Sequence, residues 1–356
     1  MAFRSAAGYA NLPNGNFSPI IFSKKTQQAF RKTSVVEDIT NSDYFGEIAN
    51  FGDTVRIIKE PEISVQEYSR GTQIVPQELD DEDFTLVVDQ ANYFAFKIDD
   101  IEEAHSHVDF ESLATDRAGY RLRDQYDQEV LGYMCGFKQS ALHGNANTAR
   151  VAGDKAGTDP ISTVDADGLL NSMKITSTDM GIGSTTANSV PITSSVTSTN
   201  SSALAILNRM ARRMDQQNVD RDGRWVVIDP VFAEILNDEN SKLLNNDFAG
   251  GQNAGDILRN GQIISGLIRG FRLYMSNNLP SVGTGPGTVA AAGSSSNFGV
   301  IVAGHDSAVA TASQIEKVES YRDNDSFSDV VRGLHLYGRK LLRPEAIITA
   351  AYNLHS

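Results

Sequence analysis

A long, polar β-hairpin is the feature of this sequence that most limits what it can fold into. Short segments with alternating apolar residues lie on both sides of an acidic run at 78–83, namely 52–59, 63–68, 84–89 and 92–97. This period of two predicts strands, but the outer part of the ribbon is too polar to bury both of its faces. Because an isolated two-stranded ribbon is only marginally stable in water, the hairpin needs a partner surface.

Charge is distributed unevenly along the first third of the chain. Residues 1–36 contain no acidic residue and five basic ones, Arg4, Lys24, Lys25, Arg31 and Lys32. Acidic residues dominate 60–116, where Arg70 and Lys97 are the only Lys or Arg. The first segment shows no sustained period and contains Gly, Asn and Pro, which predicts an extended arm ordered by the surface it lies on. The asymmetry favours docking of this arm on an acidic surface; the alternative is that both segments are simply solvated.

The longest helix predicted by the sequence spans 106–143. No proline occurs between Pro76 and Pro160, a capping box begins at Ser106, and Gly144 provides a stop. A helix of this size would be roughly 50 Å long. Its apolar residues recur nearer every four residues than every 3.6, so we expect it to lie slantwise over a sheet. A coiled coil is the weaker alternative, because clean heptads are missing.

The second half of the chain mixes helix and strand without a regular alternation. Residues 150–200 are rich in Ser, Thr, Gly and Asp and predict surface loops with short strands. A helix is predicted from Ser202, a strand at 224–229, and a helix begun by Pro230, a residue suited to a first helical position. Further strands are predicted at 267–275 and 298–303. The absence of a βαβ rhythm predicts the α+β class.

No catalytic, cofactor or metal site is expected. His105, His107 and Asp109 form the only cluster with metal-ligand types, and helix capping explains them better. A phosphate loop and a nucleophile elbow are both missing. Cys135 is the single cysteine, so the chain does not rely on a disulfide framework. The net charge of −14 disfavours broad adhesion to nucleic acid, and neither a secretory signal nor a membrane-spanning run is evident.

Four segments carry a family resemblance: 88–103, 225–230, 270–280 and 330–352. In this order they resemble the major capsid proteins of tailed bacteriophages, which share the HK97-like fold. The resemblance implies five parts, which are an N-terminal arm (1–48), an extended β-hairpin loop (49–98), a peripheral domain with a spine helix (99–145), a mixed α/β axial domain (146–317) and a C-terminal return to the peripheral domain (318–356). A sheet strand is expected at 346–351.

The resemblance also implies a function. A chain of this family self-assembles through hexamers and pentamers into the icosahedral head that encloses the double-stranded DNA of a tailed phage. Implied partners are copies of itself, a scaffolding protein, a portal and a decoration protein, with only loose contact to the packaged DNA and none to a membrane. Assembly is expected in the host cytoplasm, and the virion capsid is the final location.

Contacts between subunits are expected at five residues. Glu67, Tyr68 and Arg70 lie on the extended loop, and Arg31 and Lys32 lie in the basic arm. Some relatives crosslink their subunits through a lysine on this loop. Here Lys59 is the only lysine between 51 and 90, so non-covalent contacts are expected instead. Two rival hypotheses are a surface adhesin or binding module, suggested by the Ser/Thr/Gly-rich stretches, and a metabolic enzyme with a ligand site at 225–236.

Overall fold

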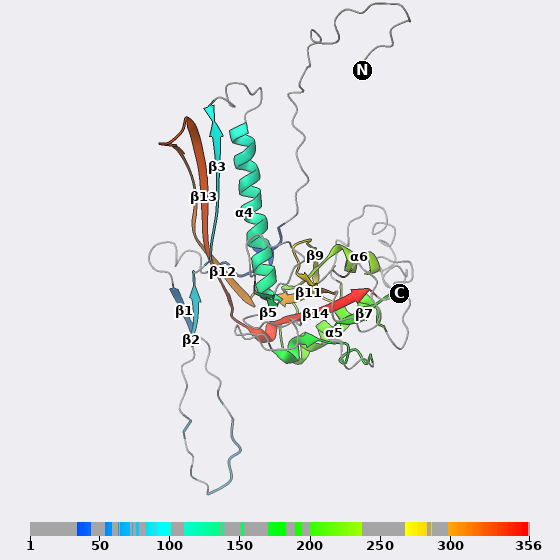
Figure 1. The fold of residues 1–356 in the computed structure, drawn as a ribbon. Coiled ribbons are helices and arrows are strands. Elements are labelled where there is room, and N and C mark those ends of the chain that lie inside the picture. Colours follow the sequence, from blue (N-terminus) through cyan, green and yellow to red (C-terminus); the bar gives the residue numbers. More distant parts are fainter. Residues whose placement is uncertain are drawn as a thin grey trace, which may run out of the picture.

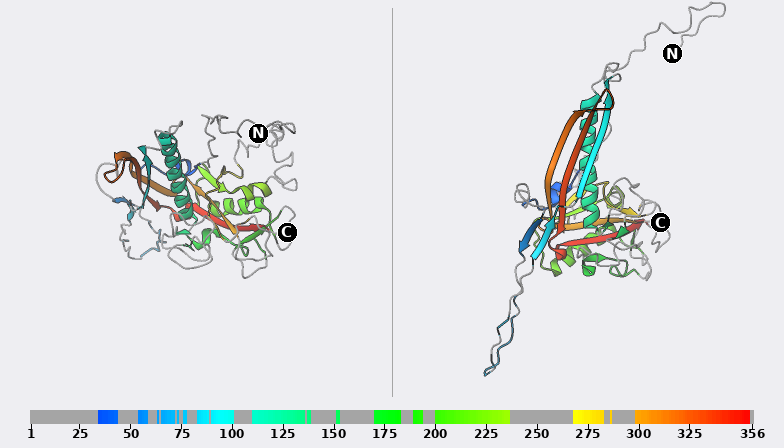
Figure 2. Two further views of the ribbon diagram at one scale, coloured as in Figure 1. Left: turned by 45° about the horizontal axis from the view of Figure 1, so that its top comes forward. Right: turned by 60° about the vertical axis from the view of Figure 1, so that its left-hand side comes forward.

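The molecule consists of a tall spine unit that stands on a broader sheet unit (Figures 1 and 2). The computed structural model describes residues 34–43, 54–58, 63, 65–71, 73, 76–77, 83–88, 90–100, 110–135, 137–138, 151–152, 170–182, 189–193, 200–236, 268–282, 286 and 298–354. Helices and strands contribute to both units, as the α+β class requires. The two units share one apolar core, in which residues of the spine helix contact residues of the large sheet.

The spine sheet has three antiparallel strands in the order β12–β13–β3, with bounds Val309–Arg322, Ser328–Leu341 and Gln90–Asp99. Its residues alternate between two faces, so that Asn92 is buried toward the helix while its neighbour Tyr93 is 76% exposed. The strand that we predicted at 92–97 therefore exists, but its assignment to the hairpin was wrong. It pairs with β13 along its full length, where Phe94 lies opposite Gly333.

The spine helix α4 spans Phe110–Met134 and lies alongside this sheet (Figure 1). Its 25 residues give a length of about 37 Å, shorter than predicted. The predicted end at His143 was wrong, because β4 (Phe137–Lys138) already pairs with β5 (Val151–Ala152). A glycine follows Cys135 in the sequence, and glycine is common just past a helix end. The predicted capping box at 106–109 and the stop at Gly144 lie outside the described residues.

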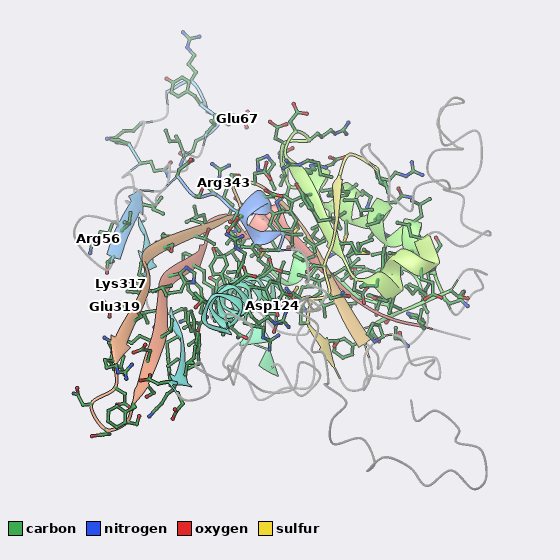
Figure 3. The ribbon with its side chains drawn as sticks, turned by 90° about the horizontal axis from the view of Figure 1, so that it is seen from above. Arg56, Glu67, Asp124, Lys317, Glu319 and Arg343 are labelled. Carbon is green, nitrogen blue, oxygen red and sulfur yellow. The ribbon has the colours of Figure 1, made fainter. Side chains whose placement is uncertain are left out.

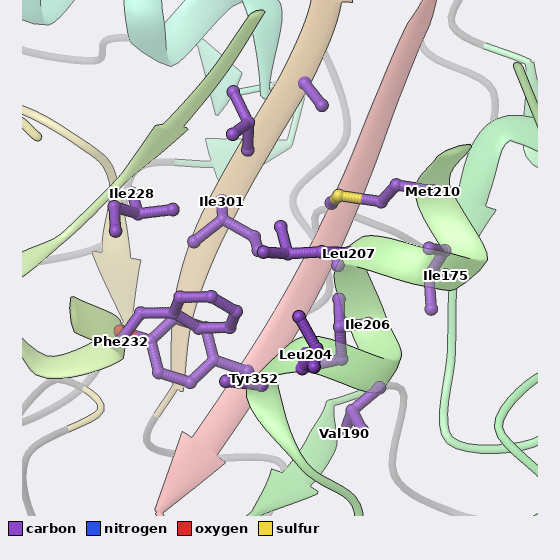
Figure 4. Close-up of a cluster of buried hydrophobic side chains, with 14 of the residues drawn as sticks. Ile175, Val190, Leu204, Ile206, Leu207, Met210, Ile228, Phe232, Ile301 and Tyr352 are labelled. Carbon is purple, nitrogen blue, oxygen red and sulfur yellow. The ribbon is translucent and has the colours of Figure 1, made fainter. Parts of the chain in front are cut away.

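The large sheet has the order β6–β14–β11–β8–β9, with β7 also pairing with β14 and β10 with β11. Its strands are β6 (Lys174–Ile175), β7 (Val190–Ile192), β8 (Arg224–Ile228), β9 (Arg272–Met275), β10 (Ser281–Val282), β11 (Phe298–His305) and β14 (Ile347–Leu354). One face packs against α4 and the other against two helices. Figure 4 shows the second face, where Ile206, Leu207 and Met210 approach Ile301.

Those two helices are α5 (Ala203–Gln216) and α6 (Pro230–Leu236), and both confirm their predictions. The side chain of Ser202 caps α5 by accepting a hydrogen bond from the amide of Ala205 at 3.2 Å. Two short 3₁₀ helices, η1 (Asn171–Met173) and η3 (Pro344–Ala346), complete the sheet unit. Of the strand predicted at 267–275, only β9 is an extended strand, because Arg269 and Gly270 turn the chain with positive φ.

The strand predicted at 346–351 is present as β14, but it lies in a different part of the fold from the one we expected. We expected residues 346–351 to return to the peripheral domain, whereas β14 lies inside the large sheet between β11 and the short strands β6 and β7. Both of its faces are apolar and buried, from Ile347 through Tyr352. A strand that is apolar on both faces requires cover on each side, and the large sheet provides it.

The extended loop starts from β1 (Thr54–Ile58) and β2 (Asp83–Val87), which pair antiparallel as predicted. Leu86 and Val88 anchor this base against Ala310 and Ala312 of β12. The strand predicted at 63–68 was wrong for the described residues, since 63 and 65–69 are not in strands. A polar ribbon without a covering surface gains too little from pairing alone. The boundaries of the five domains stay a prediction.

Candidate functional site: an assembly interface

The outer part of the extended loop projects away from the rest of the molecule, on the side opposite to the free end of the β12–β13 hairpin (Figures 1 and 2). Glu67, Tyr68 and Arg70 are all exposed there. Figure 3 shows Glu67 far from Asp124 of the spine helix. Among the residues that the structure describes, neither Glu67 nor Arg70 forms an ion pair. The loop thus presents these three side chains to the surroundings and not to its own subunit.

Apolar side chains accompany these polar ones on the loop. Val65 is 97% exposed, and Ile63 and Tyr68 are about two-thirds exposed at 67% and 64%. The chain turns at Arg70 and Gly71, where Gly71 adopts a φ of +94° that residues with a side chain rarely adopt. Exposing several large apolar residues on one projecting segment is characteristic of a surface that another protein covers.

The N-terminal arm is described from residue 34, and its short helix α1 (Val36–Ile39) docks beside α4. Val36 and Ile39 are completely buried in the core that α4 shares with the large sheet. Asn41 adds backbone pairing to β12, with its amide 2.9 Å from the carbonyl oxygen of Val309. The two predicted contact residues of the arm, Arg31 and Lys32, lie outside the described residues.

Asp127 of α4 holds the start of this arm helix. One oxygen of its buried carboxylate accepts hydrogen bonds from the Ser34 hydroxyl at 3.0 Å and from the amides of Val35 and Val36 at 2.9 and 3.0 Å. Asp127 was not among the predicted contact residues. The sequence did contain a signal, because Asp127 is an acidic residue between Tyr126 and Val130, two of the apolar residues that recur along this helix. A carboxylate at such a position needs buried donors.

The outer face of the spine sheet carries a second group of exposed apolar residues. Tyr93 of β3, Tyr321 of β12 and Leu334 of β13 are exposed there, and Phe327 at the end of the β12–β13 hairpin is 80% exposed. Ion pairs surround them. Lys97 lies 2.5 Å from Asp323 and holds the pKa of that carboxyl group well below its usual value, while Lys317 and Arg332 lower the pKa of Glu319.

A groove with a volume of about 770 Å³ lies between α1, α4 and the spine sheet. Apolar and aromatic side chains line part of it, including Tyr120, Tyr126 and Leu122, and Glu37, Arg123 and Lys317 supply charge. Burial raises the pKa of Tyr126, and Thr40 and Thr311 share a hydrogen bond of 3.0 Å beside it. The groove holds no cluster of metal-ligating residues, since the described part of the chain contains none.

Asp229 lies within 225–236, the segment named by the enzyme hypothesis, and it has a structural role. Its carboxylate accepts a hydrogen bond of 3.0 Å from the amide of Phe232 at the start of α6, and another from the hydroxyl of Tyr352. Burial raises the pKa of Asp229 and that of Tyr352. The carboxylate therefore joins α6 to β14 inside the core. Cys135 is buried as predicted, and His105, His107 and Asp109 lie outside the described residues.

None of the helices in the described ranges combines the length and the apolar character needed to cross a membrane. The described residues thus expose large apolar side chains on the loop and on the outer face of the spine sheet. Exposed apolar groups of this kind are typical of surfaces that other proteins cover.

Comparisons with known proteins agree with this picture. The family model described as phage capsid protein matches residues 83–350, and no curated protein matches the chain. Among solved structures, the chain is similar to one from Mycobacterium phage Che8, with 25% identity, a TM-score of 0.65 and coverage of 94% of this chain and 97% of that one.

Two further solved structures show the same fold at lower identity. The capsid of cyanophage Pam1 has a TM-score of 0.66 at 13% identity, with coverage of 97% of this chain and 99% of that one. The capsid of Ralstonia phage GP4 has a TM-score of 0.64 at 14% identity, with 96% of each chain covered. These comparisons do not support the adhesin hypothesis. The chain belongs to the phage capsid protein family and is a structural, HK97-like major capsid protein.

Proposed function

We propose that this chain forms the wall of the icosahedral head of a tailed phage by assembling into hexamers and pentamers around double-stranded DNA. The observation that supports the proposal best is the projecting loop. Its exposed residues Ile63, Val65 and Tyr68 cannot be covered by the described parts of the same chain. Head-to-tail contacts of this kind, in which one surface meets a different surface of the next copy, close into rings.

In this proposal Glu67, Tyr68 and Arg70 contact the adjacent subunit. Tyr68 supplies a rigid aromatic anchor, a residue type enriched at the centres of interfaces. Glu67 and Arg70 add charge of both signs, which sets the orientation of the loop on its partner. Arg31 and Lys32 of the basic arm act in the same way against acidic surfaces of a neighbour. Each contact is weak, and repetition over many copies makes the shell stable.

The remaining partners follow from the family. A separate scaffolding protein, a portal and a decoration protein are expected at the shell, and assembly is expected in the host cytoplasm. Packaged DNA touches the wall only loosely, because a chain with a net charge of −14 does not attract phosphate groups strongly. With Lys59 as the only lysine between 51 and 90, the shell is held together by non-covalent contacts.

The experiment that tests the loop contact replaces Glu67, Tyr68 and Arg70 together with alanine in the full chain. The side chains are exposed, so the stability of the free subunit is expected to change by less than about 0.5 kcal/mol. The yield of closed shells, measured by sedimentation and electron microscopy, is expected to fall at least tenfold. The matched control is Gln73→Ala, which removes another exposed side chain of the same loop. Wild-type yield of shells from the triple variant would refute the proposed contact.

A further inference from the structure

A single buried carboxylate connects three segments that lie far apart in the sequence. Asp127 is completely buried in the C-terminal half of α4. Its Oδ1 accepts hydrogen bonds from Ser34, Val35 and Val36 of the arm, which are 91 to 93 residues away. Its Oδ2 accepts a hydrogen bond of 2.8 Å from the side-chain amide of Asn278, which is 151 residues away. The carboxylate is thereby satisfied from two opposite directions.

Asn278 in turn belongs to the turn that follows β9 in the large sheet. Its amide nitrogen also donates to Asp124 at 2.9 Å, so two carboxylates of α4 share one donor group. The backbone amide of Asn278 donates to the Ser276 hydroxyl at 3.1 Å, and the amide of Ser276 donates to the carbonyl oxygen of Ile228 at 3.0 Å. A continuous chain of hydrogen bonds therefore runs from the arm through α4 to the end of β8.

We infer that Asp127 couples the docking of the N-terminal arm to the position of the 276–280 turn in the large sheet. Asp127 and Asn278 are 0% and 2% exposed, so the protein itself supplies the donors to this carboxylate while the arm is docked. A buried charged group that loses its donors is strongly destabilised. When the arm leaves, Oδ1 loses all three of its donors. The carboxylate must then shift toward new partners, and its bond to Asn278 shifts with it.

In a shell protein, this coupling links the way the arm is held to the conformation of the large sheet. Asp127 gives the arm and the large sheet a common contact inside one subunit. A change in how the arm is held is then transmitted to the turn that connects β9 with β10. Coupling between two sites is reciprocal, so a change at Asn278 also loosens the arm.

Hydrogen–deuterium exchange of the full-length, unassembled subunit tests the inference. Ile39→Ala loosens the arm by opening a cavity under α1, without altering any group of the hydrogen-bond chain. We expect exchange to rise about tenfold in residues 34–43 and at least threefold in 272–282. Asn278→Ala is the reciprocal variant, and we expect the same two segments to respond.

Two control variants separate coupling from general effects. Leu207→Ala opens a cavity in the other core cluster and controls for a loss of overall stability. Asp116→Asn alters an exposed carboxyl group of the spine helix and controls for a polar substitution that leaves the hydrogen-bond chain intact. Neither control variant is expected to raise hydrogen–deuterium exchange selectively in both 34–43 and 272–282. If Ile39→Ala accelerates exchange only in 34–43, and Asn278→Ala only in 272–282, the two sites are independent and the inference is wrong.

Discussion

Replacing Gly338 with alanine is expected to weaken the attachment of the extended loop to the spine. A methyl group at Gly338 would lie 2.4 Å from the backbone carbonyl oxygen of Val87, and 3.0 Å from the carbonyl carbon of Val87 and the Cα of Val88. Backbone atoms cannot rotate away as the end of a side chain can. The base of the loop must therefore move off β13, which disturbs the packing of Leu86 and Val88 on β12.

The size of the effect follows from two opposing terms. Overpacking of a well-filled site costs about 1–3 kcal/mol, and the reduced freedom of the unfolded chain returns about 0.4–1 kcal/mol. With each term at the middle of its range, the net loss is about 1.3 kcal/mol. Gly119 is the matched control, because it lies in the interior of α4 with nothing within 4 Å of an added methyl group. Alanine there is expected to stabilise the helix by about 1 kcal/mol.

Urea unfolding of the free subunit measures both variants, and the yield of shells reports on the loop. We expect the urea concentration at the midpoint of unfolding to fall for Gly338→Ala and to rise for Gly119→Ala. The yield of shells is expected to fall only for Gly338→Ala. A Gly338→Ala variant as stable as the wild type would show that the loop base is not packed against β13 in this way.

Three further predictions concern the core and the ionisable groups. Leu207→Ala, at a completely buried site, is expected to lower the free energy of unfolding by about 2–5 kcal/mol in urea titrations; a loss below 1 kcal/mol would contradict the packing of α5. Burial raises the pKa of Asp229 above its usual 3.8, so its neutral form is favoured in the folded state. The stability of the wild type relative to Asp229→Asn should therefore be highest below pH 4 and decline as the pH rises, and a constant difference from pH 4 to 7 would refute this. Lys97 lowers the pKa of Asp323 from 3.8, so this ion pair stabilises the β12–β13 hairpin above pH 4. The stabilisation is lost as the pH falls and Asp323 becomes protonated. The difference in unfolding midpoint between wild type and Lys97→Met should accordingly shrink from pH 6 to pH 3, and a difference that grows toward acid would contradict the pairing.

The sequence predicted those elements whose signals are local. Ser202 and Pro230 mark the starts of α5 and α6, and the spacing of apolar residues after each of them was sufficient to predict the helix. Strands β8, β11 and β14 were found because each contains a mainly apolar run. The end of α4 was missed because the apolar pattern of the sequence continues to Phe137, whereas the helix ends at Met134 and Phe137 already belongs to β4.

Pairing between distant segments could not be predicted in the same way. The strand at 92–97 has the same alternating pattern whether it pairs with the loop or with β13, and only the tertiary structure decides between the two. Asp127 is a similar case, because its role depends on Ser34 and Asn278, which are remote in sequence. For Glu67, Tyr68 and Arg70 the structure establishes exposure, and their contacts with a second subunit remain a prediction.

The most direct test of this account is a cryo-electron microscopy reconstruction of the particles that the full chain forms, alone and with its scaffolding protein. We expect closed icosahedral shells built from hexamers and pentamers, with residues 63–71 of each loop lying on the adjacent subunit. A monomer or dimer that never assembles in either condition would contradict the assignment. Closed shells in which the loop touches no neighbour would contradict the proposed contact.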